Sequence, residues 1–147
     1  MTAAPALVPE PARAAVFHGV SFRPGDHTTH SFGLEELDRE LDDPHVFSWI
    51  DVEGPDIAAL NDVLRRLDID LVLVSHFEAP EVLPRIVERS DCLAFYLYEV
   101  EDPERHLDTS HGLSEIRFAR MILVLGGSFV ITYHRRPLEA VEHVKAT

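Results

Sequence analysis

The chain has 147 residues, of which 46% are hydrophobic and 27% are charged, and its formal net charge is −13. This length and composition fit one domain with a real hydrophobic core and argue against disorder of the whole chain. The acidic balance disfavours binding to nucleic acid or to anionic lipid headgroups, and it concentrates cations near the surface.

The single cysteine, Cys92, excludes a disulfide framework within the chain and favours a reducing compartment. Because Cys92 lies in an apolar run, we expect it to be a small buried residue. No stretch is long and apolar enough for a membrane span, which needs about 20 residues, and the N-terminus lacks the pattern of a secretory signal. Contact with a membrane is therefore expected only through a C-terminal segment that is missing here.

The first third of the chain predicts a flexible N-terminal segment at residues 1–13, because it is rich in proline and alanine. Residues 14–147 are expected to form a single domain. Alternation predicts a first strand at 14–22, followed by a turn-rich loop at 24–30. Leucines at helical spacing predict a short amphipathic helix at 33–41.

The middle of the chain predicts a strand at 46–52 and the clearest helix at 56–67, where Asp56 is placed to cap the first free N–H groups. Its apolar stripe consists of Ile57, Leu60, Val63, Leu64 and Leu67. The apolar residues at 70–77 fit either a short helix or a strand.

The last third predicts strands at 86–88 and 92–100, a polar loop at 102–112 and a β-hairpin at 114–134. The strand at 92–100 is apolar on both faces, so we expect it to be central and covered on both sides. Gly126-Gly127 lies between two apolar runs and suggests a tight turn with positive φ. A helix is expected to start at Pro137. Strands interleaved with helices indicate an α/β fold with a mixed sheet.

Three segments carry a family resemblance. Residues 49–52 form a Trp-Ile-Asp-Val strand, residues 84–86 read Pro-Arg-Ile ahead of an aromatic-rich strand, and the hairpin ends in Thr132-Tyr133-His134. In order and spacing these segments resemble the N-terminal cytoplasmic domain of the CorA family of divalent-cation transporters. The resemblance covers roughly residues 46–144, and the Gly-Met-Asn pore motif of the family's membrane segment is absent.

The resemblance implies a mixed β-sheet sandwiched by helices, with an incomplete second helical layer, and it favours the helix at 70–77. It also implies a homo-oligomer, a pentamer in the full-length protein, at the cytoplasmic face of the cell membrane. His134 would have a structural role, and no nucleic acid would be bound.

The candidate metal residues are His76 and Glu78. In the CorA family a Leu-Glu-Asp segment precedes the position of Pro84, and its aspartate can join an inter-subunit regulatory site. Counting back from Pro84, this aspartate corresponds to His76. Magnesium prefers oxygen ligands, whereas imidazole suits zinc, cobalt or nickel. The site is therefore lost, or changed in character, or rebuilt with Glu78, and any Mg²⁺ or other divalent cation would be bound weakly.

Motifs of enzymes are missing: the sequence contains no GxSxG elbow, P-loop, GxGxxG or CxxC. His27 and His30 have ligand spacing but lack the glutamate of a zinc-helix motif. We therefore expect no enzyme. The predicted function is the regulatory domain of a CorA-like magnesium or cobalt transporter that senses divalent cation and gates the pore. The alternative is a stand-alone soluble α/β binding module without the transporter role.

Overall fold

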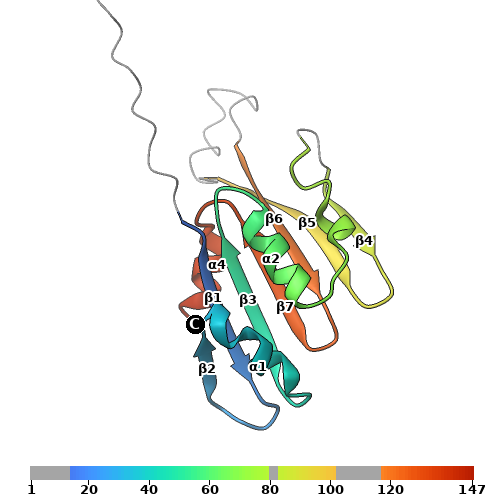
Figure 1. The fold of residues 1–147 in the computed structure, drawn as a ribbon. Coiled ribbons are helices and arrows are strands. Elements are labelled where there is room, and N and C mark those ends of the chain that lie inside the picture. Colours follow the sequence, from blue (N-terminus) through green and yellow to red (C-terminus); the bar gives the residue numbers. More distant parts are fainter. Residues whose placement is uncertain (1–13, 80–82, 102–116) are drawn as a thin grey trace, which may run out of the picture.

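The structure is a computed structural model that describes residues 14–79, 83–101 and 117–147 (Figure 1). The expectations for the segment at 1–13, the loop at 102–112 and the first residues of the hairpin lie outside these described residues.

The described part of the chain is built on one seven-stranded sheet with the order β2-β1-β3-β7-β6-β5-β4. The strands are β1 (Val16–Phe22), β2 (Thr29–Phe32), β3 (Phe47–Glu53), β4 (Arg85–Glu88), β5 (Leu93–Val100), β6 (Phe118–Leu125) and β7 (Phe129–His134). β3 and β7 are parallel, and the five other neighbouring pairs are antiparallel. The mixed sheet confirms the predicted α/β class.

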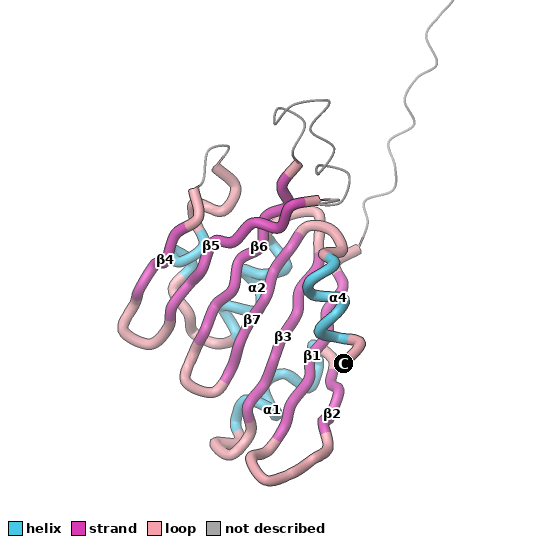
Figure 2. Tube along the Cα trace, turned by 180° about the vertical axis from the view of Figure 1, so that it is seen from behind, coloured by secondary structure: helices cyan, strands magenta, loops and turns pink. Residues whose placement is uncertain are grey.

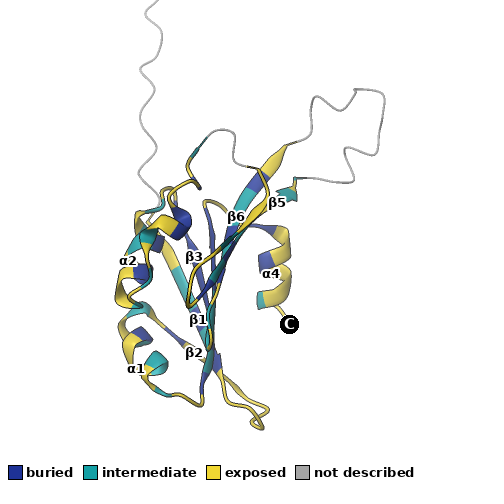
Figure 3. Ribbon diagram, turned by 90° about the vertical axis from the view of Figure 1, so that its right-hand side faces the viewer, coloured by how far each residue is buried: buried dark blue, intermediate teal, exposed yellow. Residues whose placement is uncertain are grey.

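Helices lie on both faces of this sheet, but unequally (Figure 3). One face carries α1 (Leu37–Asp42) and α2 (Ala58–Arg66), with the 3₁₀ helices η1 (Leu34–Glu36) and η2 (Leu71–Val74) beside them in the chain. The other face carries α4 (Glu139–Lys145), which Figure 2 shows in front of the sheet. No helix among the described residues is long and apolar enough to cross a membrane.

The main core fills the space between the sheet and the α1/α2 layer. Alternate residues of the strands point into it, as expected for strands with one buried face. Its fully buried members are Leu37, Ile50, Leu60, Leu64, Leu73, Ala94, Ile122, Val124, Ile131 and Tyr133. The predicted stripe of α2 is confirmed by Leu60, Val63 and Leu64. The hydroxyl of Tyr96 donates to the carbonyl of Leu73 over 2.6 Å, which fixes η2 to β5.

The hairpin is confirmed, but the reason given for its glycines is wrong. Leu125 pairs with Val130, and the N–H of Gly126 donates to the carbonyl of Phe129 over 2.9 Å. Among the described glycines only Gly25 has φ in the left-handed region. Gly126 is instead favoured by packing, because a Cβ there would lie 2.3 Å from Cζ of Phe129 and the ring would have to shift.

Two further expectations need correction. A loop was predicted at 24–30, but the edge strand β2 already begins at Thr29. β2 pairs with β1, for example through His30 and Ser21. β5 was expected to be covered on both sides, yet only its Ala94 and Tyr96 face is buried, and Leu97 on the other face is 37% exposed. The physical reason is the unequal layering, since α4 is the one described helix on that face and packs against Ala119, Trp49 and Met121.

Candidate functional site

A network of polar side chains lies buried between the sheet and α4. The parallel register of β3 and β7 places Asp51 beside Thr132 and Glu53 beside His134, all on the face that α4 covers. The side chains of His134 and Asp51 are 0% and 2% exposed. Two of the three segments that carry the family resemblance, the strand with Trp49 and Asp51 and the hairpin end with Thr132 and His134, contribute to this network.

The carboxylate of Asp51 is the centre of the network. The hydroxyl of Thr132 donates to its Oδ1 over 2.5 Å, and Nε2 of His134 lies 3.0 Å from the same oxygen. Nζ of Lys145, near the C-terminal end of α4, lies 2.7 Å from Oδ2. Nε1 of Trp49 donates in turn to the Thr132 hydroxyl over 3.0 Å. Asp51 therefore ties together β3, β7 and α4.

The ring of His134 faces an acceptor at each nitrogen, since Nδ1 lies 2.7 Å from the backbone carbonyl of Arg136. Both nitrogens donate only when the ring is protonated. Burial alone would lower the pKa of His134, but the hydrogen bond to the Asp51 carboxylate and its charge outweigh burial, so the pKa is raised. The second carboxylate nearby is that of Glu53, 4.0 Å from Nδ1.

The pKa values of Asp51 and Lys145 are also shifted toward the charged form of each group. Burial would raise the pKa of Asp51, but hydrogen bonds from His134, Lys145 and Thr132 hold it below its ordinary value. Burial would likewise lower the pKa of Lys145, but the bond to Asp51 raises it. Each partner thus favours the charged form of the others, and the contacts of the network join β3, β7 and α4.

The sequence prediction for His134, a structural role, agrees with this geometry, but the partners of His134 were missed. Part of the network could have been predicted from strand alternation. Asp51 follows Trp49 by two positions, and His134 follows Thr132 by two, so each pair lies on one face of its strand. That pattern does not predict that β3 pairs with β7, nor that Lys145 contacts Asp51.

The predicted metal residues His76 and Glu78 lie after η2 and are both exposed, on either side of the buried Phe77. Glu78 forms an ion pair with Arg135, the residue that follows β7. Within the described residues no three His, Cys, Asp or Glu side chains gather closely enough to hold a metal ion. A site that used His76 and Glu78 would need further donors, such as water or a second copy of the chain, and it stays a prediction.

Comparison with protein families gives a match over most of the chain. Residues 44–147 match the family described as "CorA-like Mg2+ transporter protein". A comparison with curated proteins finds no match.

Solved structures show the same fold at low sequence identity. The full-length CmaX protein superposes with a TM-score of 0.65 and 14% identity, over 94% of this chain and 40% of that one. The CorA magnesium transporter from Methanocaldococcus jannaschii gives 0.57 and 12%, over 87% and 35%. The ZntB cytoplasmic domain from Vibrio parahaemolyticus RIMD 2210633 gives 0.56 and 12%, over 88% and 48%. The chain therefore spans less than half the length of each of these structures.

Proposed function

The chain belongs to the CorA-like Mg²⁺ transporter family, and we propose that it is the cytoplasmic regulatory domain of a magnesium or cobalt transporter, where it senses divalent cation and gates the pore. One observation carries the proposal: the family match at residues 44–147 coincides with a fold shared with the soluble domain of CorA from Methanocaldococcus jannaschii at a TM-score of 0.54.

The excess of acidic side chains provides a way for the domain to respond to divalent cations. The chain has 26 acidic and 13 basic side chains, so copies of it repel one another at low ionic strength. Divalent cations that gather between acidic surfaces would relieve this repulsion and favour a closed, symmetric homo-oligomer. Loss of the cations would loosen the assembly, which is a shift of population between two states.

The buried network supports a mechanical role for α4 in this proposal. Because Lys145 is bonded to Asp51 at the centre of the sheet, α4 is expected to move with the sheet as one body. The start of α4 is held as well, since the carboxylate of Glu99 accepts from the N–H groups of Glu139 and Ala140 over 3.0 and 3.2 Å. A displacement of the domain would therefore be passed on to whatever α4 is joined to. No catalytic step is part of this function.

A stand-alone α/β binding module is the second candidate, and one observation favours it. Glu78, the carboxylate nearest to the position of the family's regulatory aspartate, is bound by Arg135 rather than open to a cation. A module of this kind would keep the fold without the response to divalent ions.

Sedimentation velocity on the chain tests the proposal. The chain is expected to be monomeric or weakly associated in NaCl and to associate more strongly when Mg²⁺ replaces Na⁺ at constant ionic strength. An association that depends on ionic strength alone, with no difference between Mg²⁺ and Na⁺, would favour the binding module. A stable pentamer without divalent cation would contradict the charge argument directly.

A further inference from the structure

A cavity of about 350 Å³ lies at the end of the sheet where β6 begins and β7 ends. Its polar lining consists of Arg120, Arg135, Arg136 and Glu78, and its apolar lining includes Phe118 and Leu138. This cavity is separate from the buried network around Asp51, although both border on the segment that joins β7 to α4.

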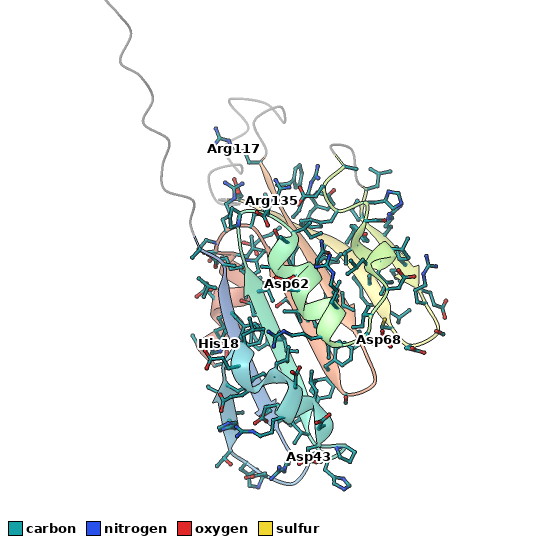
Figure 4. All side chains as sticks on the ribbon, in the orientation of Figure 1. His18, Asp43, Asp62, Asp68, Arg117 and Arg135 are labelled. Carbon is teal, nitrogen blue, oxygen red and sulfur yellow. The ribbon has the colours of Figure 1, made fainter. Side chains whose placement is uncertain are left out.

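The cavity is unusual for its charge. Three of the chain's 13 cationic side chains line it, against one carboxylate, although the whole chain carries −13. A fourth arginine, Arg117, precedes β6, and Figure 4 shows Arg117 and Arg135 at the same end of the sheet. Arginine presents a planar fork of donors that matches carboxylate and phosphate groups.

Two of these arginines are held by contacts within the protein, Arg120 through its guanidinium and Arg136 through its backbone. Nη1 of Arg120 donates to the backbone carbonyls of Phe77 and Ala79 over 3.1 and 2.6 Å, which fixes its guanidinium against the wall of the cavity. The backbone of Arg136 is held by the buried ring of His134, whose Nδ1 lies 2.7 Å from the Arg136 carbonyl. The guanidinium of Arg120, fixed in this way, loses less conformational entropy when a ligand binds.

The ion pairs of Arg135 and Arg136 show which groups these two arginines bind. Arg135 is bound by the carboxylate of Glu78 and Arg136 by that of Glu101, so each guanidinium already holds an oxyanion. The side chains of Arg135 and Glu78 are 50% and 41% exposed, and exposed pairs of this kind are weak because water and salt screen them. An external anion with more than one charge can displace such a partner.

We propose that this cavity is a binding site for a small oxyanion that carries phosphate or carboxylate groups. The anion takes the place of Glu78 on Arg135, is shared with Arg136 and Arg120, and rests any carbon skeleton against Phe118 and Leu138. Glu78 is then the internal counter-ion of Arg135 until an anion binds. This assignment goes beyond cation sensing, and it gives Glu78 a partner other than a metal.

Calorimetric titration with inorganic phosphate and with citrate, each at ionic strength kept constant with NaCl, tests the site and distinguishes the two ligand chemistries. The native chain should give saturable binding of at least one of them. Arg135→Gln should weaken that binding about tenfold, as expected for loss of one charge-assisted contact. Glu78→Gln should strengthen it, because the competing carboxylate is gone.

Arg65 and Asp62 provide the matched controls, since they form an exposed ion pair on α2 that lies outside the cavity. Arg65→Gln and Asp62→Asn make the same changes of net charge, so they should leave the affinity within about twofold of the native value at constant ionic strength. The proposal is overturned if neither anion binds saturably, if Glu78→Gln weakens binding, or if the control variants change it as much as the cavity variants do.

Discussion

The carboxylate of Asp51 lies 3.0 Å from Nε2 of His134, although 83 positions separate the two residues in the chain. Both side chains are buried beneath α4, and Lys145 of that helix completes the contact from the other side. The relationship explains how two short motifs act together: they occupy adjacent parallel strands in the same register. It also means that α4 is held on the sheet by a charged contact as well as by apolar packing.

Asp51→Asn should destabilise the protein by about 3–5 kcal/mol, because it leaves the buried ring of His134 and the partly buried ammonium group of Lys145 without their carboxylate. Urea unfolding followed by circular dichroism measures this. Asp38→Asn, at an exposed position on α1, is the control with the same chemical change and should alter the free energy of unfolding by less than about 0.5 kcal/mol. A loss for Asp51→Asn no larger than that of the control would show that the network does not stabilise the fold.

Stability should fall as the pH rises above about 6.5, the ordinary pKa of histidine. The pKa of His134 is raised in the folded protein, so its protonated form stabilises the fold. That contribution is complete below the pKa of the unfolded chain and is lost as the pH passes through the raised value. The groups that face the ring are Asp51 and Glu53 from β3 and the carbonyl of Arg136, while Lys145 of α4 reaches it through Asp51.

His134→Gln provides the comparison for this pH dependence. The free energy of unfolding, measured by urea titration at several pH values from 6 upwards, should vary less with pH in the variant than in the native chain. Equal slopes for the two proteins would assign the pH dependence to other groups.

Gly126→Ala should destabilise the hairpin by about 1–2 kcal/mol, because the new methyl group forces the ring of Phe129 out of its position. Gly127→Ala is the matched control in the same turn, since nothing lies within 4 Å of its added Cβ. Thermal unfolding should separate the two variants. If Gly127→Ala proves the more damaging, backbone conformation rather than packing explains the glycine pair.

Magnesium should bind to the chain weakly and without a dedicated set of ligands, because imidazole at His76 is a poor magnesium ligand. Any tight site near His76 and Glu78 should prefer cobalt or zinc. Calorimetric titration of the native chain and of His76→Ala with the three ions decides this. Tight magnesium binding that survives His76→Ala would place the site elsewhere.

Most strands and helices were predictable from the sequence, because alternation and helical spacing are local properties. Ile50 and Val52 alternate with Trp49 and Asp51 as a strand requires, and the leucines of α2 recur at helical spacing. β2 was missed because its Thr-His-Ser-Phe sequence buries only Phe32, so it lacks the apolar alternation that marks a strand.

The arrangement of the sites was less predictable, because contacts between distant residues leave no mark on local periodicity. No spacing indicates that β7 pairs with β3 rather than with another strand, nor that Lys145 returns to Asp51. The ion pair of Glu78 with Arg135 could not be predicted from the sequence either, since it depends on how the turn after η2 lies against the end of β7.

Uptake of Mg²⁺ by cells that express the protein from its own complete gene tests the central claim most directly. In magnesium-depleted cells that lack other uptake systems, we predict an uptake that slows as intracellular Mg²⁺ rises, and Asp51→Asn should weaken this slowing because α4 is no longer tied to the sheet. Uptake that is absent, or that continues unchanged at high intracellular Mg²⁺, would contradict the assignment of this domain as the sensor and gate of a transporter.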